Sequence, residues 1–241
     1  MKRASEIDPF LSNDPRFVSP VQAFVDLTIF LAVMYLVRQF YISEMGFWGN
    51  TLFKSFMTVG AATLLLHLRG QNWRDLGLIK PKRYLQLLGM VVVTLAGVIA
   101  TIMLFEIFIR DLLPAAFQTP SIESDGGERF DELKGNLPYF FSIILWVWIE
   151  SCLEELQDRG FALNRFQSLF SRLPLAVVLA VVFQAAIFGY RHAPSHGLSG
   201  ALTTGLIGLA FGISYVVFKR NLWPVIIAHV VLNTMSMVGR V

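Results

Sequence analysis

The sequence predicts an all-α fold: a polytopic transmembrane helical bundle of about seven helices (six to eight) with a polar intramembrane cavity. Hydrophobic residues make up 55% of the 241 residues and charged residues only 15%, which is more apolar than soluble domains usually are. The apolar residues gather in blocks of roughly 20, the helix length that crosses a hydrocarbon core. Polar groups inside these blocks predict the cavity, because they are costly in hydrocarbon.

The apolar blocks give the order of the expected helices. Residues 1–19 contain charges of both signs and no apolar core of a signal peptide, so we expect a cytoplasmic N-terminal segment before a signal-anchor helix. Residues 20–241 are expected to form a single transmembrane domain, because no repeat or long polar linker divides them. The expected helices cover residues 20–42, 47–68, 87–105, 137–149, 173–190, 198–218 and 222–238.

Loop charge predicts the orientation. Several basic residues gather between the second and third helices, which indicates a cytoplasmic link. They are Arg69, Arg74, Lys80, Lys82 and Arg83. Alternation then places the N-terminus in the cytoplasm and the acidic link 110–136 outside, for an integral protein of the plasma (inner) membrane. The net charge of +3 is small and comes from loops, which favours the lipid bilayer over nucleic acid as a partner.

The first polar cluster follows the fourth apolar block. Arg159 lies four residues after Glu155, the favourable order for an ion pair on a helix. Glu154 lies about 100° around the helix, on the face of Glu150 and Asp158, and is expected to lack a paired cation. Such a carboxylate suits a general base. The alternative is a solvated amphipathic extension at the membrane surface.

Two further clusters contain histidine. His229 and Asn233 are four residues apart on one helical face, where they could stabilise an oxyanion or only join helices through hydrogen bonds. Phe188 and His192 share a face in the same way, and Pro194 is expected to end that helix, which leaves His196 in a loop. Together with the glutamate, these groups could activate a water for peptide hydrolysis.

All three clusters resemble the motifs of the CAAX-prenyl-protease and bacteriocin-processing (CPBP) family of intramembrane glutamate proteases, in order and in spacing. The match covers about residues 137–238, the expected protease-like core. The matching residues are Glu154, Glu155 and Arg159 for E-E-x-x-x-R, Phe188 and His192 for F-x-x-x-H, and His229 and Asn233 for H-x-x-x-N.

The resemblance implies catalytic roles for four of these residues. Glu154 and His192 would activate water, while His229 and Asn233 would hold the oxyanion. Glu155, Arg159 and Phe188 would support the site. One departure is that Gln157 and Asp158 stand where the family usually has apolar or aromatic residues, so an extra acid lies near Glu154.

The resemblance also constrains the topology. If Glu154 ended its span at the inner surface and His192 ended the next at the outer one, they would lie some 25 Å apart. The fourth helix has only Pro138 and Gly160 as breaking residues up to residue 170 and could run on as one long helix. We therefore expect it to carry Glu154 into the membrane, and the next helix to begin outside the bilayer or to bend near Gly189.

The resulting prediction is an endopeptidase without a cofactor, acting on a hydrophobic or lipidated peptide or protein, including a prenylated CAAX-type one. One alternative is a zinc site formed by His192, His229 and Glu154. Another is a non-catalytic membrane partner or chaperone with the same fold. Cys152, the single cysteine, is expected to be a packing residue rather than a nucleophile.

Overall fold

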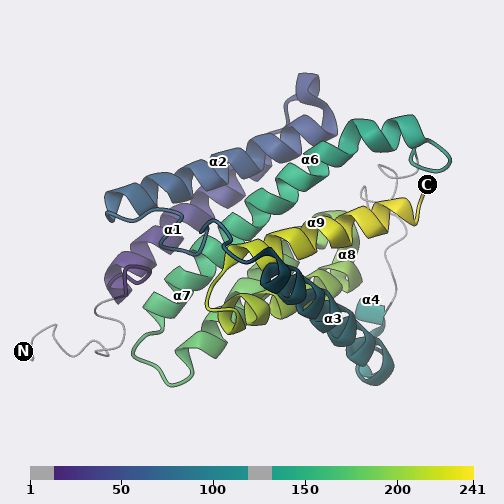
Figure 1. Cartoon of the computed structure of the whole chain (residues 1–241). Coiled ribbons are helices and arrows are strands. Elements are labelled where there is room, and N and C mark those ends of the chain that lie inside the picture. The colour runs from purple at the N-terminus through teal and green to yellow at the C-terminus, as the bar shows by residue number, and fades with distance from the viewer. Residues whose placement is uncertain (1–13, 119–131) are drawn as a thin grey trace, which may run out of the picture.

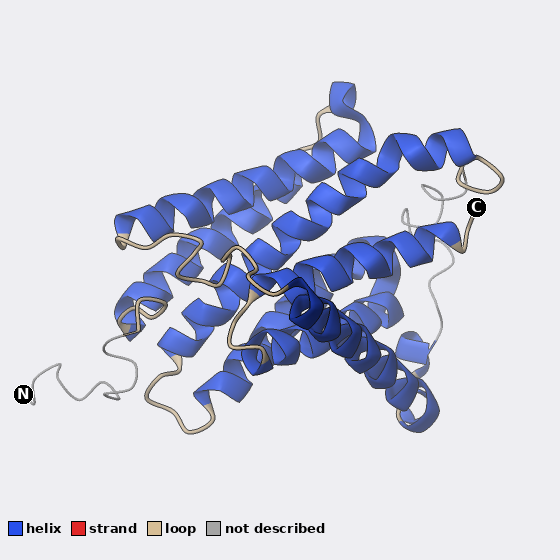
Figure 2. Ribbon diagram, viewed as in Figure 1, coloured by secondary structure: helices blue, strands red, loops and turns tan. Residues whose placement is uncertain are grey.

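The computed structural model describes residues 14–118 and 132–241, and within these ranges the chain is helical, without any strand (Figures 1 and 2). Residues 1–13 of the expected cytoplasmic segment and residues 119–131 of the acidic link lie outside the described residues. The helices are α1 (Pro20–Leu36), α2 (Gly46–Leu68), α3 (Tyr84–Phe108), α4 (Ala115–Gln118), α6 (Leu137–Glu155), α7 (Leu163–Leu169), α8 (Ala176–Val217) and α9 (Leu222–Val238).

Six stretches of helix are long and apolar enough to cross a membrane, and α9 is a shorter apolar helix. The all-α transmembrane bundle is therefore confirmed. Several helices begin at the residues that the sequence would select. Ser19 caps α1 in a capping box that is followed by Pro20, Asn136 accepts from the Tyr139 amide at 3.1 Å, and Asn221 accepts from the Trp223 amide at 3.1 Å.

The fourth span is one long helix. A π-helical stretch, Leu156–Ala162, joins α6 to α7, so that Leu137–Leu169 is a continuous span of 33 residues. At about 1.5 Å per residue this is about 50 Å, longer than the hydrocarbon core of about 30 Å. Glu154 lies near its middle, as expected for a helix that carries this residue into the membrane. π-Helical turns are frequent at functional sites.

Helix α8 is a hairpin of two spans, Ala176–Pro194 and His196–Val217. The break lies at Gly197, with a φ of 63°, between the expected helices 173–190 and 198–218. The bend near Gly189, one of the two alternatives for the first of these helices, is absent. Gly189 instead allows the two spans to approach closely, because a Cβ there would lie 2.5 Å from the Ala201 carbonyl oxygen. The placement of His196 in a loop is wrong, since it opens the second span.

The long fourth span contacts helices on several sides. Helix α6 packs against both α2 and α9, α1 packs against α2 and α7, and α3 crosses α8 and α9 (Figure 1). The core beside the π-helical stretch is aromatic: the rings of Phe30 and Phe161 lie 4.9 Å apart, and neither is exposed. The large apolar side chains that remain exposed, such as Leu85 and Val92 on α3, suit a lipid environment.

The segments predicted to share one side of the membrane do meet at one end of the bundle. The Val18 amide donates to Ser168 at 3.3 Å, which joins the N-terminal segment to α7. The Leu222 amide donates to the Gly77 carbonyl at 3.1 Å, which joins the 69–83 link to the start of α9. The chain thus forms an integral membrane bundle with these segments on one side, while the cytoplasmic assignment of that side stays a prediction.

Candidate active site

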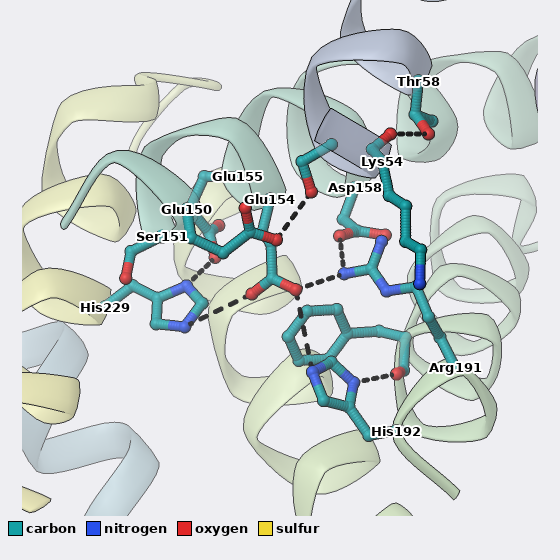
Figure 3. Close-up of polar contacts among 12 residues, drawn as sticks. Lys54, Thr58, Glu150, Ser151, Glu154, Glu155, Asp158, Arg191, His192 and His229 are labelled. Carbon is teal, nitrogen blue, oxygen red and sulfur yellow. Dashed lines mark hydrogen bonds and ion pairs between the residues drawn. The ribbon is translucent and has the colours of Figure 1, made fainter. Parts of the chain in front are cut away.

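Three helices bring the polar clusters together around Glu154 (Figure 3). Its Oε1 atom lies 3.7 Å from His192 Nε2, and its Oε2 atom lies 3.7 Å from His229 Nε2. Glu154 belongs to α6, His192 to α8 and His229 to α9. The Glu154 side chain is 12% exposed, so the carboxylate is largely shielded yet accessible from one side. Residues far apart in the sequence therefore converge on one carboxylate.

His192 is oriented by the turn of helix that precedes it. Its Nδ1 atom lies 2.7 Å from the Phe188 carbonyl oxygen, and the two rings are 4.8 Å apart. A carbonyl only accepts hydrogen bonds, so Nδ1 carries the hydrogen. In the neutral ring, Nε2 is then an acceptor, and it is the atom that faces Glu154.

His229 is oriented by a buried ion pair. Its Nδ1 atom lies 2.7 Å from Glu155 Oε1, and the same oxygen accepts from Arg159 at 3.0 Å. The side chains of Glu155 and Arg159 are both fully buried. Arg159 also donates to the Gly208 carbonyl at 3.2 Å and lies over the Phe188 ring at 4.5 Å. The expected Glu155–Arg159 pair is present, and it holds His229 from the side opposite Glu154.

Asn233 lies one turn beyond His229. Its Nδ2 atom donates to Ser151 Oγ at 2.9 Å, and Ser151 in turn donates to the Val147 carbonyl at 2.8 Å. A carboxamide nitrogen carries two hydrogens, so this contact leaves the second for another acceptor. Ser151 was not predicted from the sequence, and it fixes the orientation of the amide.

Arg191 also belongs to the cluster, and the sequence prediction assigned it no role. Its NH2 atom lies 3.0 Å from Glu154 Oε1 and 2.8 Å from Asp158 Oδ2. The expectation that Glu154 lacks a paired cation is therefore wrong. Asp158, the extra acid that departs from the family pattern, shares this cation. Two features of the sequence could have predicted this pair: Asp158 departs from the family pattern, and Arg191 directly precedes the motif residue His192.

The cluster is buried within the bundle rather than solvated. Asp158 is 1% exposed and Arg159 is 0% exposed, which contradicts the alternative of an amphipathic extension at the membrane surface. Cys152 packs against the hydrophobic core and does not line the cavity described next, in agreement with a packing role.

A cavity of about 720 Å³ opens beside Glu154. Its wall includes Glu154, His192, His229 and Asn233, the four residues predicted to be catalytic. Aromatic and aliphatic side chains cover another part of the wall, namely Tyr35, Phe47, Trp48, Tyr190, Leu232 and Met237. The volume is within the range of about 300–1,000 Å³ that is usual for ligand pockets. The site thus combines a polar centre with an apolar binding surface.

The donors of the alternative zinc site fit a metal ion poorly. In the parts of the chain that are described, no group of three or more His, Cys, Asp or Glu side chains could hold one. One oxygen of Glu154 already accepts from Arg191, whose positive charge opposes a second cation at that atom. A chelator experiment can decide between the two chemistries.

Comparison with known proteins agrees with this geometry. Residues 136–235 match the family described as type II CAAX prenyl endopeptidase Rce1-like. No curated protein and no solved structure matches the chain. The matched residues run from the cap of α6 into α9 and include Glu154, His192, His229 and Asn233. This segment, which contains the whole polar cluster, is therefore similar to the Rce1-like family of CAAX prenyl endopeptidases.

Proposed function

We propose that the protein is an intramembrane endopeptidase that hydrolyses a peptide bond in a membrane-associated, CAAX-type peptide or protein. The observation that carries the proposal is the position of Glu154. Its carboxylate faces the Nε2 atoms of His192 and His229, each at 3.7 Å, beside a cavity in the middle of a membrane-spanning helix. Ionisable side chains are energetically costly inside a membrane, so such a cluster is a candidate functional site.

The first step is the activation of water by Glu154 and His192. A separation of 3.7 Å between carboxylate oxygen and imidazole nitrogen leaves room for a water that bonds to both. The water gives its proton to this pair while its oxygen attacks the peptide carbonyl carbon. Arg191 keeps the carboxylate in place through its 3.0 Å contact.

The second step is the stabilisation of the tetrahedral oxyanion by His229 and Asn233. His229 has a carboxylate beside each ring nitrogen, Glu155 at Nδ1 and Glu154 at Nε2, so both hydrogens of the imidazolium form would have an acceptor. Its Nε2 hydrogen and the second amide hydrogen of Asn233 are then the oxyanion donors. The C–N bond breaks, and the proton taken from water passes to the leaving amine.

The cavity wall supports a hydrophobic substrate. Phe47, Trp48 and Met237 offer an apolar surface within the same cavity as Glu154. A lipid chain or the apolar side chains of a peptide can therefore bind while the scissile bond lies against the polar centre. The family match, to CAAX prenyl endopeptidases, agrees with this substrate class.

The test is cleavage of quenched fluorescent peptides by the detergent-purified full chain. The peptides form matched prenylated and unprenylated pairs, and each is assayed with and without a chelator. We expect cleavage of at least the lipidated members, unchanged by the chelator. Loss of cleavage with the chelator, restored by zinc, would favour the metal site. If the well-folded protein cleaves no peptide, a non-catalytic membrane partner becomes the better account.

A further inference from the structure

A second cavity, of about 540 Å³, lies at the end of the bundle where α3 begins and α8 ends. It shares no lining residue with the cavity beside Glu154. Among the described residues, its wall contains cationic side chains and no carboxylate, so we refer to it as the basic cavity. The cations are Arg16, Lys80, Lys82, Arg83, Lys219 and Arg220. Like charges gathered around one concavity repel one another, and a bound anion relieves that repulsion.

Four of these cations are available to a ligand. Arg16 pairs with Asp14, and the buried Arg220 donates to Asn164 at 2.7 Å, so these two already have polar partners. The other four are exposed and form no salt bridge within residues 14–118 and 132–241. They are Lys80, Lys82, Arg83 and Lys219.

Close backbone packing gives the basic cavity a defined shape. A Cβ at Gly77, which has a φ of 98°, would lie 1.7 Å from the Arg220 carbonyl oxygen, so only glycine allows this approach. Lys219 and Arg220 have φ values of 56° and 61°, which are uncommon for residues with a side chain and persist only where the surroundings maintain them. In this turn Lys219 is exposed while Arg220 is buried. The link 69–83 and the turn between α8 and α9 are thus held together beside the cavity.

The start of α3 favours negative charge at the same place. No described side chain caps the first turn of α3, and that turn contains no acidic residue. Its free amide groups and the helix dipole favour an anion. Arg83, which directly precedes the helix, and Gln86, in its first turn, both line the basic cavity. The helix start and the cations therefore act in the same direction.

An apolar surface continues from the basic cavity along α3. Leu87 and Met90 belong to the cavity wall, and the neighbouring side chains Leu88 and Val92 are 58% and 57% exposed. Of the six spans, α3 is the least buried within the bundle, so this surface faces lipid. A free phosphate would use only the cations. A phospholipid places its phosphate at the membrane surface and its acyl chains beside the helix, so it matches both parts of the site.

We propose that the basic cavity binds the headgroup phosphate of one anionic phospholipid, with an acyl chain lying along α3. The bound lipid connects the start of α3 to the link 69–83 and to the turn between α8 and α9. It therefore stabilises the packing of α3 against α8 and α9. This site is independent of the proposed peptide hydrolysis, because none of its residues lines the cavity beside Glu154.

The test is native mass spectrometry of the full chain in an uncharged detergent, titrated with phosphatidylglycerol or with phosphatidylcholine of the same acyl chains. Both lipids carry a phosphate, but only phosphatidylglycerol has a net negative charge. We expect one phosphatidylglycerol per chain, bound at least about tenfold more tightly than phosphatidylcholine. The double variant Lys82→Gln/Lys219→Gln should lose this preference.

The matched control is the double variant Arg74→Gln/Arg172→Gln. It removes two exposed positive charges from links at the same end of the bundle, but neither residue lines the basic cavity. We expect it to keep the preference for phosphatidylglycerol. Equal binding of the two lipids by the wild type would overturn the inference. An equal loss of preference in the two double variants would also overturn it, because general positive charge on this side would then explain the binding.

Thermal unfolding distinguishes a lipid from a free anion. Phosphatidylglycerol should raise the melting temperature of the wild type and of the control variant, and should have little effect on Lys82→Gln/Lys219→Gln. Inorganic phosphate should give little shift in any of them, because it has no acyl chain to lie along α3. A shift from inorganic phosphate as large as that from the lipid would assign the cavity to a free anion and overturn the proposal.

Discussion

Two buried polar clusters contact the same long span, Leu137–Leu169, but only one of them borders the cavity. At the end of the bundle, Asp26 pairs with Arg69 at 2.8 Å and with Arg165 at 2.9 Å, and Arg165 also donates to Gln71 at 2.6 Å. In the middle of the bundle, Glu154 has one such contact, to Arg191, and faces its two histidines at 3.7 Å. The end cluster is closed, whereas the central cluster borders a cavity.

Charge and burial alone do not identify a functional site. Asp26 and Arg165 have fully buried side chains, more so than Glu154, yet neither lines the cavity. A buried ion pair with short contacts fixes the position of helices, here α1 against α7. A cluster with open hydrogen-bonding capacity beside a cavity can bind and transform a ligand. Mutations in the two regions should therefore affect different quantities.

The largest effect on stability is expected from the end cluster. Asp26→Asn leaves the charges of Arg69 and Arg165 without their partner, and breaking a buried pair costs about 3–5 kcal/mol. Denaturant unfolding of the purified protein measures the change. Asp111→Asn, on an exposed aspartate, should stay within about 0.5 kcal/mol of wild type. A variant at Asp26 that unfolds like wild type would show that this cluster does not hold the helices together.

The next effect is on catalysis at α9. His229→Ala and Asn233→Ala each remove one expected oxyanion donor, so kcat should fall by about 10²–10³ with little change in melting temperature. His196→Ala is the matched control, because His196 also lines the cavity and its ring lies 5.9 Å from that of His192. We expect less than a tenfold loss there. An equal loss in all three variants would contradict the assigned roles.

A smaller effect is expected at Ser151, which orients Asn233 without reaching the substrate. Ser151→Ala removes the acceptor at 2.9 Å, and we expect about a tenfold loss in kcat with KM nearly unchanged. Ser142→Ala removes an exposed hydroxyl earlier on the same helix and should have no effect on kcat. A rise in KM alone would instead place Ser151 in substrate binding.

The smallest effect concerns pH dependence at the N-terminal segment, outside the membrane spans. A hydrogen bond from Arg16 lowers the pKa of Asp14 below its usual value of 3.8. Because the folded pKa is depressed, the stabilisation is present above the usual value and is lost as the pH falls through the lowered one. Asp14→Asn should cost at most about 1 kcal/mol at neutral pH, and nothing in strong acid. A cost that persists in strong acid would exclude this ion pair as its source.

The helices could be predicted from the sequence because apolar length alone defines a membrane span. The expected helix over residues 222–238 coincides with α9, and the expected continuation of the fourth helix is present as Leu137–Leu169. The break between the expected helices 173–190 and 198–218 is present at Gly197, whereas the role of Gly189 could not be predicted from the sequence. Only the packing of the two spans shows that one provides close contact and the other a positive φ.

The candidate site could be predicted only where its contacts lie within one helix. Spacing on a helix predicted the Glu155–Arg159 pair, since both residues belong to one element. Arg191 was missed because its partners lie 33 and 37 residues earlier in the chain, on another helix.

The most direct test of the central claim measures cleavage and thermal unfolding together for Glu154→Gln and Asp26→Asn. We predict that kcat of Glu154→Gln falls by about 10²–10⁴ because the general base is lost, whereas its melting temperature falls less than that of Asp26→Asn because Asp158 still pairs with Arg191. Asp26→Asn should melt earlier but keep its kcat wherever it remains folded. A Glu154→Gln variant that cleaves at the wild-type rate, or that loses activity only in proportion to lost fold, would contradict the account.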